Sequence, residues 1–185
     1  MNKMKKEKFN SKFWEVCGDD ELRPNLRCVY FSNGRLYATD GSIVLLQKTD
    51  LHNFSPEDIE NLEGRMVHKE VFKSISALKI EYPEKIKFLA DAIEVTGDSG
   101  KIYYSYFATE PYNIEDIIEN YKLKETSPIT RICLNSDYIK KLSSAMISTY
   151  MIFYFKGESN LIKVLCEDYS EYEQCAYFMP RKVEK

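Results

Sequence analysis

The chain has 185 residues, of which 44% are hydrophobic and 30% charged, and its formal net charge is −3. This length corresponds to one large domain or two small ones with a sizeable core. The acidic balance argues against a protein that wraps nucleic acid over its whole surface, but it is compatible with a local basic face. No stretch approaches the roughly 18 apolar residues of a membrane span, and no apolar segment typical of a signal peptide follows the basic start. We therefore expect a cytoplasmic protein.

The cysteines and histidines do not form a metal-binding pattern. The sequence has five cysteines, an odd number, and no C-x-x-C pair. Most of them stand in apolar segments that are typical of strands. We expect them to be reduced thiols of the core in a reducing compartment. With only two histidines and no ligand spacing, we expect neither a metal site nor a cofactor. The residues are Cys17, Cys28, Cys133, Cys166, Cys175, His52 and His68.

The first third of the chain predicts a short helix followed by a strand meander. Residues 10–18, "NSKFWEVCG", predict a helix of barely two turns with Ser11 as a candidate N-cap. The turn signals Asn33-Gly34 and Asp40-Gly41 then separate three runs of strand-forming residues, as in a pair of tight hairpins. The predicted strands are 26–34, 35–41 and 42–50.

The middle third predicts a strand, a helix and three more strands, after a polar connection at 51–63. Within 68–79, Val71, Phe72, Ile75 and Leu78 recur at helical spacing, which predicts an amphipathic helix. The predicted strands are 64–67 before this helix and 85–91, 92–98 and 101–107 after it.

The last third predicts the same order after a longer connection that runs from 110 to 128. The N-cap types Asn135, Ser136 and Asp137 precede a helical pattern at 138–147. The predicted strands are 130–134 before the helix and 150–157, 161–168 and 173–180 after it.

The order β-α-β-β-β therefore occurs three times, which predicts a repeated architecture. We assign units to 9–60 and 63–119, which form a domain over 1–121, and a third unit to 122–185. The predicted class is α+β, with antiparallel sheets on the outside and helices on an inner face. The alternative is three unrelated α+β segments that share an element order by chance.

Three short motifs, in this order along the chain, resemble the bacterial DNA polymerase sliding clamp, the beta clamp. "RLYATDGSIVL" is similar to the family's L-x-x-x-A-T-D-G-H-R-L, with a match over 38–41 but Ser42 and Ile43 in place of His and Arg. "YNIEDII" resembles the family's segment F-P-[DN]-Y-x-x-[VI]-[IL]-P without its final Pro, and "CAYFMPRKV" resembles its C-terminal segment at Met179 and Pro180. The best match is the family's middle domain followed by the second half of its last domain.

The resemblance implies a clamp-like fold in which helices line a hole for duplex DNA. Lysines on such helices attract phosphates without reading bases. Lys69 and Lys73 stand at i and i+4 and so share a helix face. The alternative is an ordinary solvated helix face. The candidate DNA-binding residues are Lys12, Lys69, Lys73, Lys140 and Lys141.

The resemblance also implies a hydrophobic groove that holds a short peptide of a replication protein. In the family it is built from the T-D-G-H-R-L region and the C-terminal segment. Ser42 in place of His and Tyr177 in place of a small aliphatic residue reshape it, and the alternative is that these are plain strand and core residues. The candidate partner-binding residues are Thr39, Ser42, Val44, Tyr177 and Met179.

We therefore predict a sliding-clamp-like accessory protein of DNA replication that encircles double-stranded DNA, tethers a partner and forms a homo-oligomer. The alternative is a clamp-fold protein-binding adaptor without DNA encirclement. An enzyme is not expected: Glu167 and Asp168 stand in a turn with no His nearby, and no nucleophile elbow, P-loop or dinucleotide fingerprint occurs.

Overall fold

A computed structural model of the protein describes residues 8–78, 85–123, 126, 132–157 and 160–181. The strands form one seven-stranded and one three-stranded sheet, and every strand pairing among the described residues is antiparallel. The predicted α+β class with antiparallel sheets is therefore confirmed. None of the helices in this part of the chain is long and apolar enough to cross a membrane.

The first third folds into a three-stranded meander preceded by two 3-10 turns. Asn33 and Gly34 both have positive φ, 54° and 68°, as a two-residue hairpin loop between strands requires. The predicted helix at 10–18 is wrong in type and length: it is one 3-10 turn whose N-cap is Lys12 and not Ser11. The elements are η1 (Phe13–Val16), η2 (Pro24–Arg27), β1 (Cys28–Ser32), β2 (Arg35–Thr39), β3 (Ile43–Lys48) and η3 (Thr49–Leu51).

The middle third follows the predicted order, but the polar connection before it contains the helix α1. Ser55 and Asp58 form a capping box in which each side chain accepts a hydrogen bond from the other's backbone N–H, and Pro56 stands at the first helical position. The predicted helix at 68–79 is shorter in the structure, and its last residue lies outside the described residues. The elements are α1 (Pro56–Leu62), β4 (Met66–His68), α2 (Lys69–Ala77), β5 (Ile86–Phe88), β6 (Ala92–Gly97) and β7 (Gly100–Ser105).

The last third also contains a helix that the pattern did not predict, within the connection at 110–128. The predicted strand at 130–134 is present only as one isolated bridge, between Cys133 and Arg181, and residues 130 and 131 lie outside the described residues. Asn135 caps the following helix by accepting the N–H of Asp137 at 2.9 Å. The elements are α3 (Glu115–Leu123), α4 (Ser136–Ala145), β8 (Met151–Tyr154), β9 (Ile162–Cys166) and β10 (Gln174–Phe178).

The first and last meanders share one sheet. Its strand order is β4-β1-β2-β3-β10-β9-β8, so β3 and β10 are direct neighbours although their sequences lie far apart. β5, β6 and β7 form the smaller sheet, while β4 from the same third of the chain pairs with β1. The domain boundary that we predicted between residues 121 and 122 falls inside α3.

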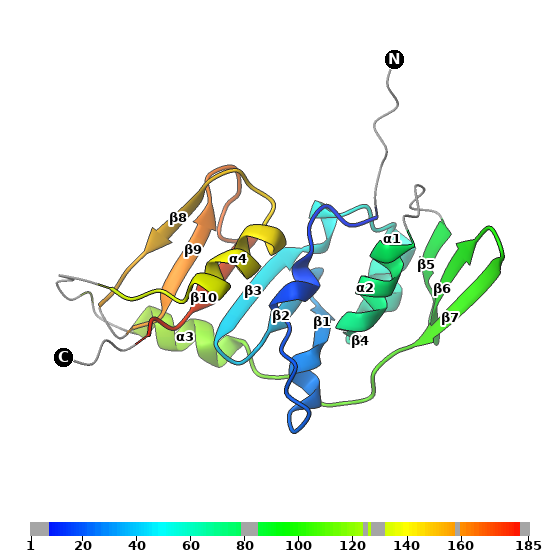
Figure 1. The fold of residues 1–185 in the computed structure, drawn as a ribbon, viewed down its shortest axis with the longest axis horizontal. Helices are drawn as coiled ribbons and strands as arrows, with labels where there is room; N and C mark the ends of the chain where they lie inside the picture. Colours follow the sequence, from blue (N-terminus) through cyan, green and yellow to red (C-terminus); the bar gives the residue numbers. More distant parts are fainter. Residues whose placement is uncertain (1–7, 79–84, 124–125, 127–131, 158–159, 182–185) are drawn as a thin grey trace, which may run out of the picture.

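Alternating side chains give the seven-stranded sheet two buried faces. Along β3, Ile43 and Leu45 belong to the main core, whereas Val44 and Leu46 belong to a second cluster on the opposite face. We call the first the helix face, because η1, α2 and α4 pack on it, and Figure 1 shows α2 and α4 in front of the sheet. We call the second the α3 face, because α3 packs on it through Tyr121.

A chain of buried polar side chains lies within the helix-face core. Gln47 donates to the Ala145 carbonyl at 2.8 Å and to the Gln174 side chain. His52 lies 3.4 Å from the Gln47 oxygen, and its Nδ1 accepts the Asn10 N–H at 3.1 Å. Burial lowers the pKa of His52 to about 3, so this ring is neutral in the folded protein.

Candidate partner groove and helix face

The turn that carries the A-T-D-G motif is held by its own side chains. Thr39 is buried, its hydroxyl donates to the Ile43 carbonyl, and it accepts the Gly41 N–H at 3.0 Å. The Asp40 carboxylate accepts the N–H groups of Ser42 and Ile43, both at 2.9 Å. Gly41 has a φ of +89°, a backbone conformation that residues with a side chain rarely adopt. These residue types are therefore explained by the turn itself.

The structure brings the other predicted groove residues together across the pair β3 and β10. Val44 lies opposite Tyr177 in the antiparallel register, and the Met179 N–H donates to the Ser42 carbonyl at 3.2 Å. Met179 is 45% exposed, whereas Val44 and Tyr177 are buried. The two motifs, far apart in sequence, thus meet at one end of this strand pair.

The buried part of this groove is covered by α3. The ring centroids of Tyr121 and Tyr177 are 5.2 Å apart in an edge-on contact. The Tyr177 hydroxyl donates to Glu171 at 3.1 Å, and burial raises the pKa of Tyr177 well above its usual value. Sequence reasoning missed α3, although Ile114, Ile117 and Ile118 with Tyr121 stand at helical spacing.

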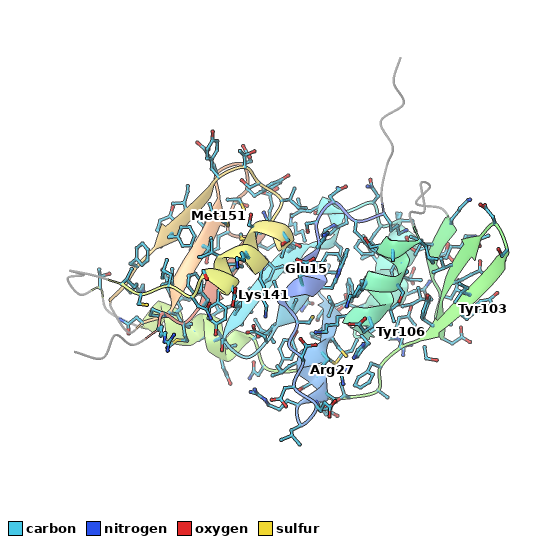
Figure 2. All side chains as sticks on the ribbon, viewed as in Figure 1. Glu15, Arg27, Tyr103, Tyr106, Lys141 and Met151 are labelled. Carbon is cyan, nitrogen blue, oxygen red and sulfur yellow. The ribbon has the colours of Figure 1, made fainter. Side chains whose placement is uncertain are left out.

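The elements that carry the predicted DNA-binding lysines, η1, α2 and α4, share the helix face. The backbone N–H of Lys12, at the start of η1, donates to the Ser144 carbonyl of α4 at 3.0 Å. Glu15 of η1 and Lys141 of α4 accordingly lie on adjacent elements (Figure 2).

Two of the five lysines are engaged in contacts that hold the fold. Lys69 is only 12% exposed, donates to the Gly18 carbonyl at 2.8 Å and forms an ion pair with Asp19. The hydrogen bond from Lys69 to the Asp19 carboxylate holds the pKa of Asp19 below its usual value. Lys141 binds Asp40 of the motif turn at 2.6 Å. The i, i+4 spacing of Lys69 and Lys73 therefore does not produce a pair of free cations.

The other three lysines are exposed, and each also faces a carboxylate. The distances are 3.5 Å from Lys12 to Glu15, 3.4 Å from Lys73 to Glu70 and 3.2 Å from Lys140 to Asp137. The five candidate lysines thus meet five different carboxylates, and these pairs carry no net charge. A field that attracts phosphate needs an excess of cations, which these pairs do not supply.

The cysteines agree with the predicted core thiols. All five are free, and only Cys133 is not fully buried. Burial raises the pKa of Cys28 and of Cys175 to about 12, so these thiols are protonated at neutral pH. Among the described residues, no group of three His, Cys, Asp or Glu could hold a metal ion.

Solved structures of bacterial sliding clamps match almost the whole of this chain. The DNA polymerase III subunit beta of Borrelia burgdorferi, in complex with a natural product, matches 96% of the chain with a TM-score of 0.64 at 15% identity. The beta subunit of Thermotoga maritima matches 94% with a TM-score of 0.62 at 12% identity. This chain has the fold of a bacterial sliding clamp. The clamp of Bartonella birtlesii bound to griselimycin matches 93% with a TM-score of 0.64 at 12% identity.

The likeness to these clamps is one of fold and not of sequence. No protein-family model matches the chain. No curated protein matches it significantly in sequence either. The chain spans 63% of the length of the Borrelia and Thermotoga clamps and 64% of the Bartonella clamp.

Proposed function

We propose that this chain is a non-catalytic accessory protein of DNA replication that holds a replication partner at the groove between β3 and β10. The observation that carries the proposal is the junction of the motif turn with the C-terminal segment. There the backbone N–H of Met179 donates to the carbonyl of Ser42 at 3.2 Å. In the clamps that the sequence resembles, these two segments build the groove for a polymerase peptide. The clamp fold over more than nine-tenths of the chain supports the same use here.

Griselimycin is bound in the solved structure of the Bartonella clamp, and we propose it as the probe for this groove. We expect the wild-type chain to bind griselimycin in calorimetry and Met179→Asp to weaken binding at least tenfold. Tyr150→Asp is the matched control, because Tyr150 is also an exposed apolar side chain but precedes β8 at the far end of the strands. A wild-type chain that binds no griselimycin, or a Met179→Asp variant that binds it unchanged, would count against the groove.

Encirclement of duplex DNA is the second candidate function. The helical elements η1, α2 and α4 gather on one face of the sheet, as a DNA-lining surface requires. The five pairs between lysine and carboxylate argue for weak attraction to phosphate, and so favour the adaptor role over encirclement.

The salt dependence of DNA binding separates these two roles. For an adaptor, we expect binding to a 30-bp duplex to be weak and to change less than about tenfold between 50 and 200 mM salt. A fall of about 10³–10⁵ would instead indicate six to ten phosphate contacts and support a DNA-lining face. Lys12, Lys73 and Lys140 are the lysines to replace with Glu in that case, because Lys69 and Lys141 also hold the fold.

We also propose that the chain self-associates through two of its edge strands, β8 of the larger sheet and β7 of the smaller sheet. In the described part of the chain, no strand pairs with the outer edge of β8 or of β7, whereas β4 is met by the Phe107 N–H at 2.8 Å. Both strands expose large apolar side chains. Tyr103 and Met151, one from each strand, lie at opposite ends of the molecule (Figure 2), so one copy can meet the next head to tail.

Light scattering across a micromolar concentration series tests this association. We expect an oligomer for the wild-type chain and a monomer for Ile152→Lys, which adds a charge to the edge strand. Ile152 is 41% exposed, so the replacement leaves the core intact. A strictly monomeric wild-type chain would reject the proposed contact.

A further inference from the structure

The α3 face presents an apolar surface whose occupant belongs to the same chain. The sheet contributes residues from β2, β3 and β10, and the segment 111–123 covers them. Its covering side chains recur at i, i+3, i+4 and i+7, which is the spacing of an amphipathic helix bound in a groove. The sheet residues are Tyr37, Val44, Leu46, Cys175 and Tyr177, and the covering residues are Ile114, Ile117, Ile118 and Tyr121.

Hydrogen bonds tie this segment to the rest of the molecule at its two ends. At the start, the Tyr112 hydroxyl donates to the Tyr37 carbonyl at 3.1 Å. At the end, Lys156 donates to the carbonyls of Tyr121 and Lys122 at 3.0 and 3.2 Å, where a cation also complements the helix dipole. Between these ends, α3 is held to the sheet by apolar contacts.

The start of the segment borders a pocket. A cavity of about 250 Å³ opens there between the sheet and the segment. A nine-residue helix is also too short to be stable alone, so α3 depends on its contacts with the sheet. The cavity is lined by Tyr30, Ser32, Tyr37, Pro111, Tyr112, Asn113 and Ile114.

We infer that the α3 face is a helix-binding surface, that α3 is its ligand in cis, and that a partner engages it by displacing α3. The inference rests on the proposed partner groove, because Val44 and Tyr177 of that groove lie under α3. Met179 remains 45% exposed at the open end, where a partner makes its first contact. The partner that this surface fits is an amphipathic helix with Ile and Tyr anchors at the spacing of α3.

A peptide copy of α3 tests the inference without any replication partner or DNA. The probe is a fluorescein-labelled peptide of residues 111–123, read by fluorescence anisotropy against the full chain. A tethered ligand acts at an effective concentration of roughly millimolar, so wild-type α3 competes strongly with the peptide. We expect the variant Ile114→Ser/Tyr121→Ala, which weakens the cis helix, to bind the peptide at least tenfold more tightly than the wild type.

Two controls define the result. Lys122→Gln changes α3 on an exposed side chain and should bind the peptide like the wild type. Adding Tyr177→Ala to the double variant should abolish its gain. Equal affinity of the wild type and the double variant, or no saturable binding to the double variant, overturns the inference. A chain that binds this peptide but not griselimycin retains the helix-binding surface and loses only the proposed function.

Hydrogen exchange of the wild-type chain tests the same inference where the double variant fails to fold. We expect the amides of α3 to exchange at least 100-fold faster than those of α4, because α3 opens without unfolding the sheet. Exchange of both helices at the same rate would mean that α3 leaves only on global unfolding, which overturns the inference.

Discussion

On one face of the seven-stranded sheet, three helical elements share a continuous aromatic core, and on the other a single nine-residue helix covers a small apolar cluster. The first face is rich in charges, yet its candidate lysines meet carboxylates in pairs. The second has its predicted partner groove half covered by the chain itself. We therefore expect the helix face to hold the molecule together, and the helix that covers the α3 face to be replaceable by a partner.

The largest expected effect is a loss of stability from a cavity in the core of the helix face. Phe72 is fully buried, and its ring centroid lies 5.0 Å from that of Phe13 and 5.4 Å from that of Phe9. We expect Phe72→Ala to lower the free energy of unfolding by about 3–5 kcal/mol in urea denaturation, because it leaves a cavity in the core. Tyr121→Ala on the α3 face should cost about 2 kcal/mol or less. An equal or larger cost for Tyr121→Ala would contradict the contrast between the faces.

The second effect is a pH dependence that belongs to the helix-face core. Burial lowers the pKa of His52 from its ordinary value of 6.5 to about 3 in the folded protein, so between these two pH values the unfolded chain binds a proton that the folded chain does not. Stability therefore falls as the pH drops below 6.5, by about 2 kcal/mol between pH 7 and pH 5. Urea denaturation at these two pH values measures the loss.

His52→Gln is the control for this pH dependence. It removes the titrating group, so most of the difference between pH 7 and pH 5 should disappear, whatever the variant's absolute stability. His68, whose pKa is also lowered by burial, accounts for a smaller remainder. An unchanged slope in His52→Gln would show that other groups carry the pH dependence.

Local signals in the sequence predicted the strands well and the helices less completely. Asn33-Gly34 marked a hairpin, and the three meanders follow from strand-forming runs between turn residues. The capping box at Ser55 and Asp58 was also readable, but the polar composition of the segment hid α1. In α3, the stripe of apolar residues was assigned to a connection because the segment is long and carries Pro111 and Pro128.

The tertiary partners were not readable from one sequence. No local sequence pattern indicates that β3 pairs with β10, or that Lys141 forms an ion pair with Asp40 of the motif turn. The adjacency of the two motifs followed from the resemblance alone, and in the structure Val44 pairs with Tyr177 across β3 and β10. The lysine pattern likewise gave the positions of cations but not the carboxylates that face them.

The smallest expected effect separates two neighbouring lysines of α4. Lys141 is 32% exposed and binds Asp40 at 2.6 Å, while Lys140 is 77% exposed and faces Asp137 at 3.2 Å within its own helix. Asp40 is itself largely buried, so removing its cation leaves a poorly solvated carboxylate. We expect Lys141→Met to lower the free energy of unfolding by about 1–2 kcal/mol, measured in urea.

Lys140→Met is the matched control, because it removes the same charge from an exposed ion pair, the one between Lys140 and Asp137 of the same helix. Exposed pairs contribute little, so its cost should stay below about 0.5 kcal/mol. The double replacement Lys141→Met/Asp40→Asn should recover part of the loss, since the uncompensated carboxylate is gone. Equal costs for the two single variants would mean that Lys141 belongs with the solvated charges of the helix face, and it would become a candidate for DNA contact again.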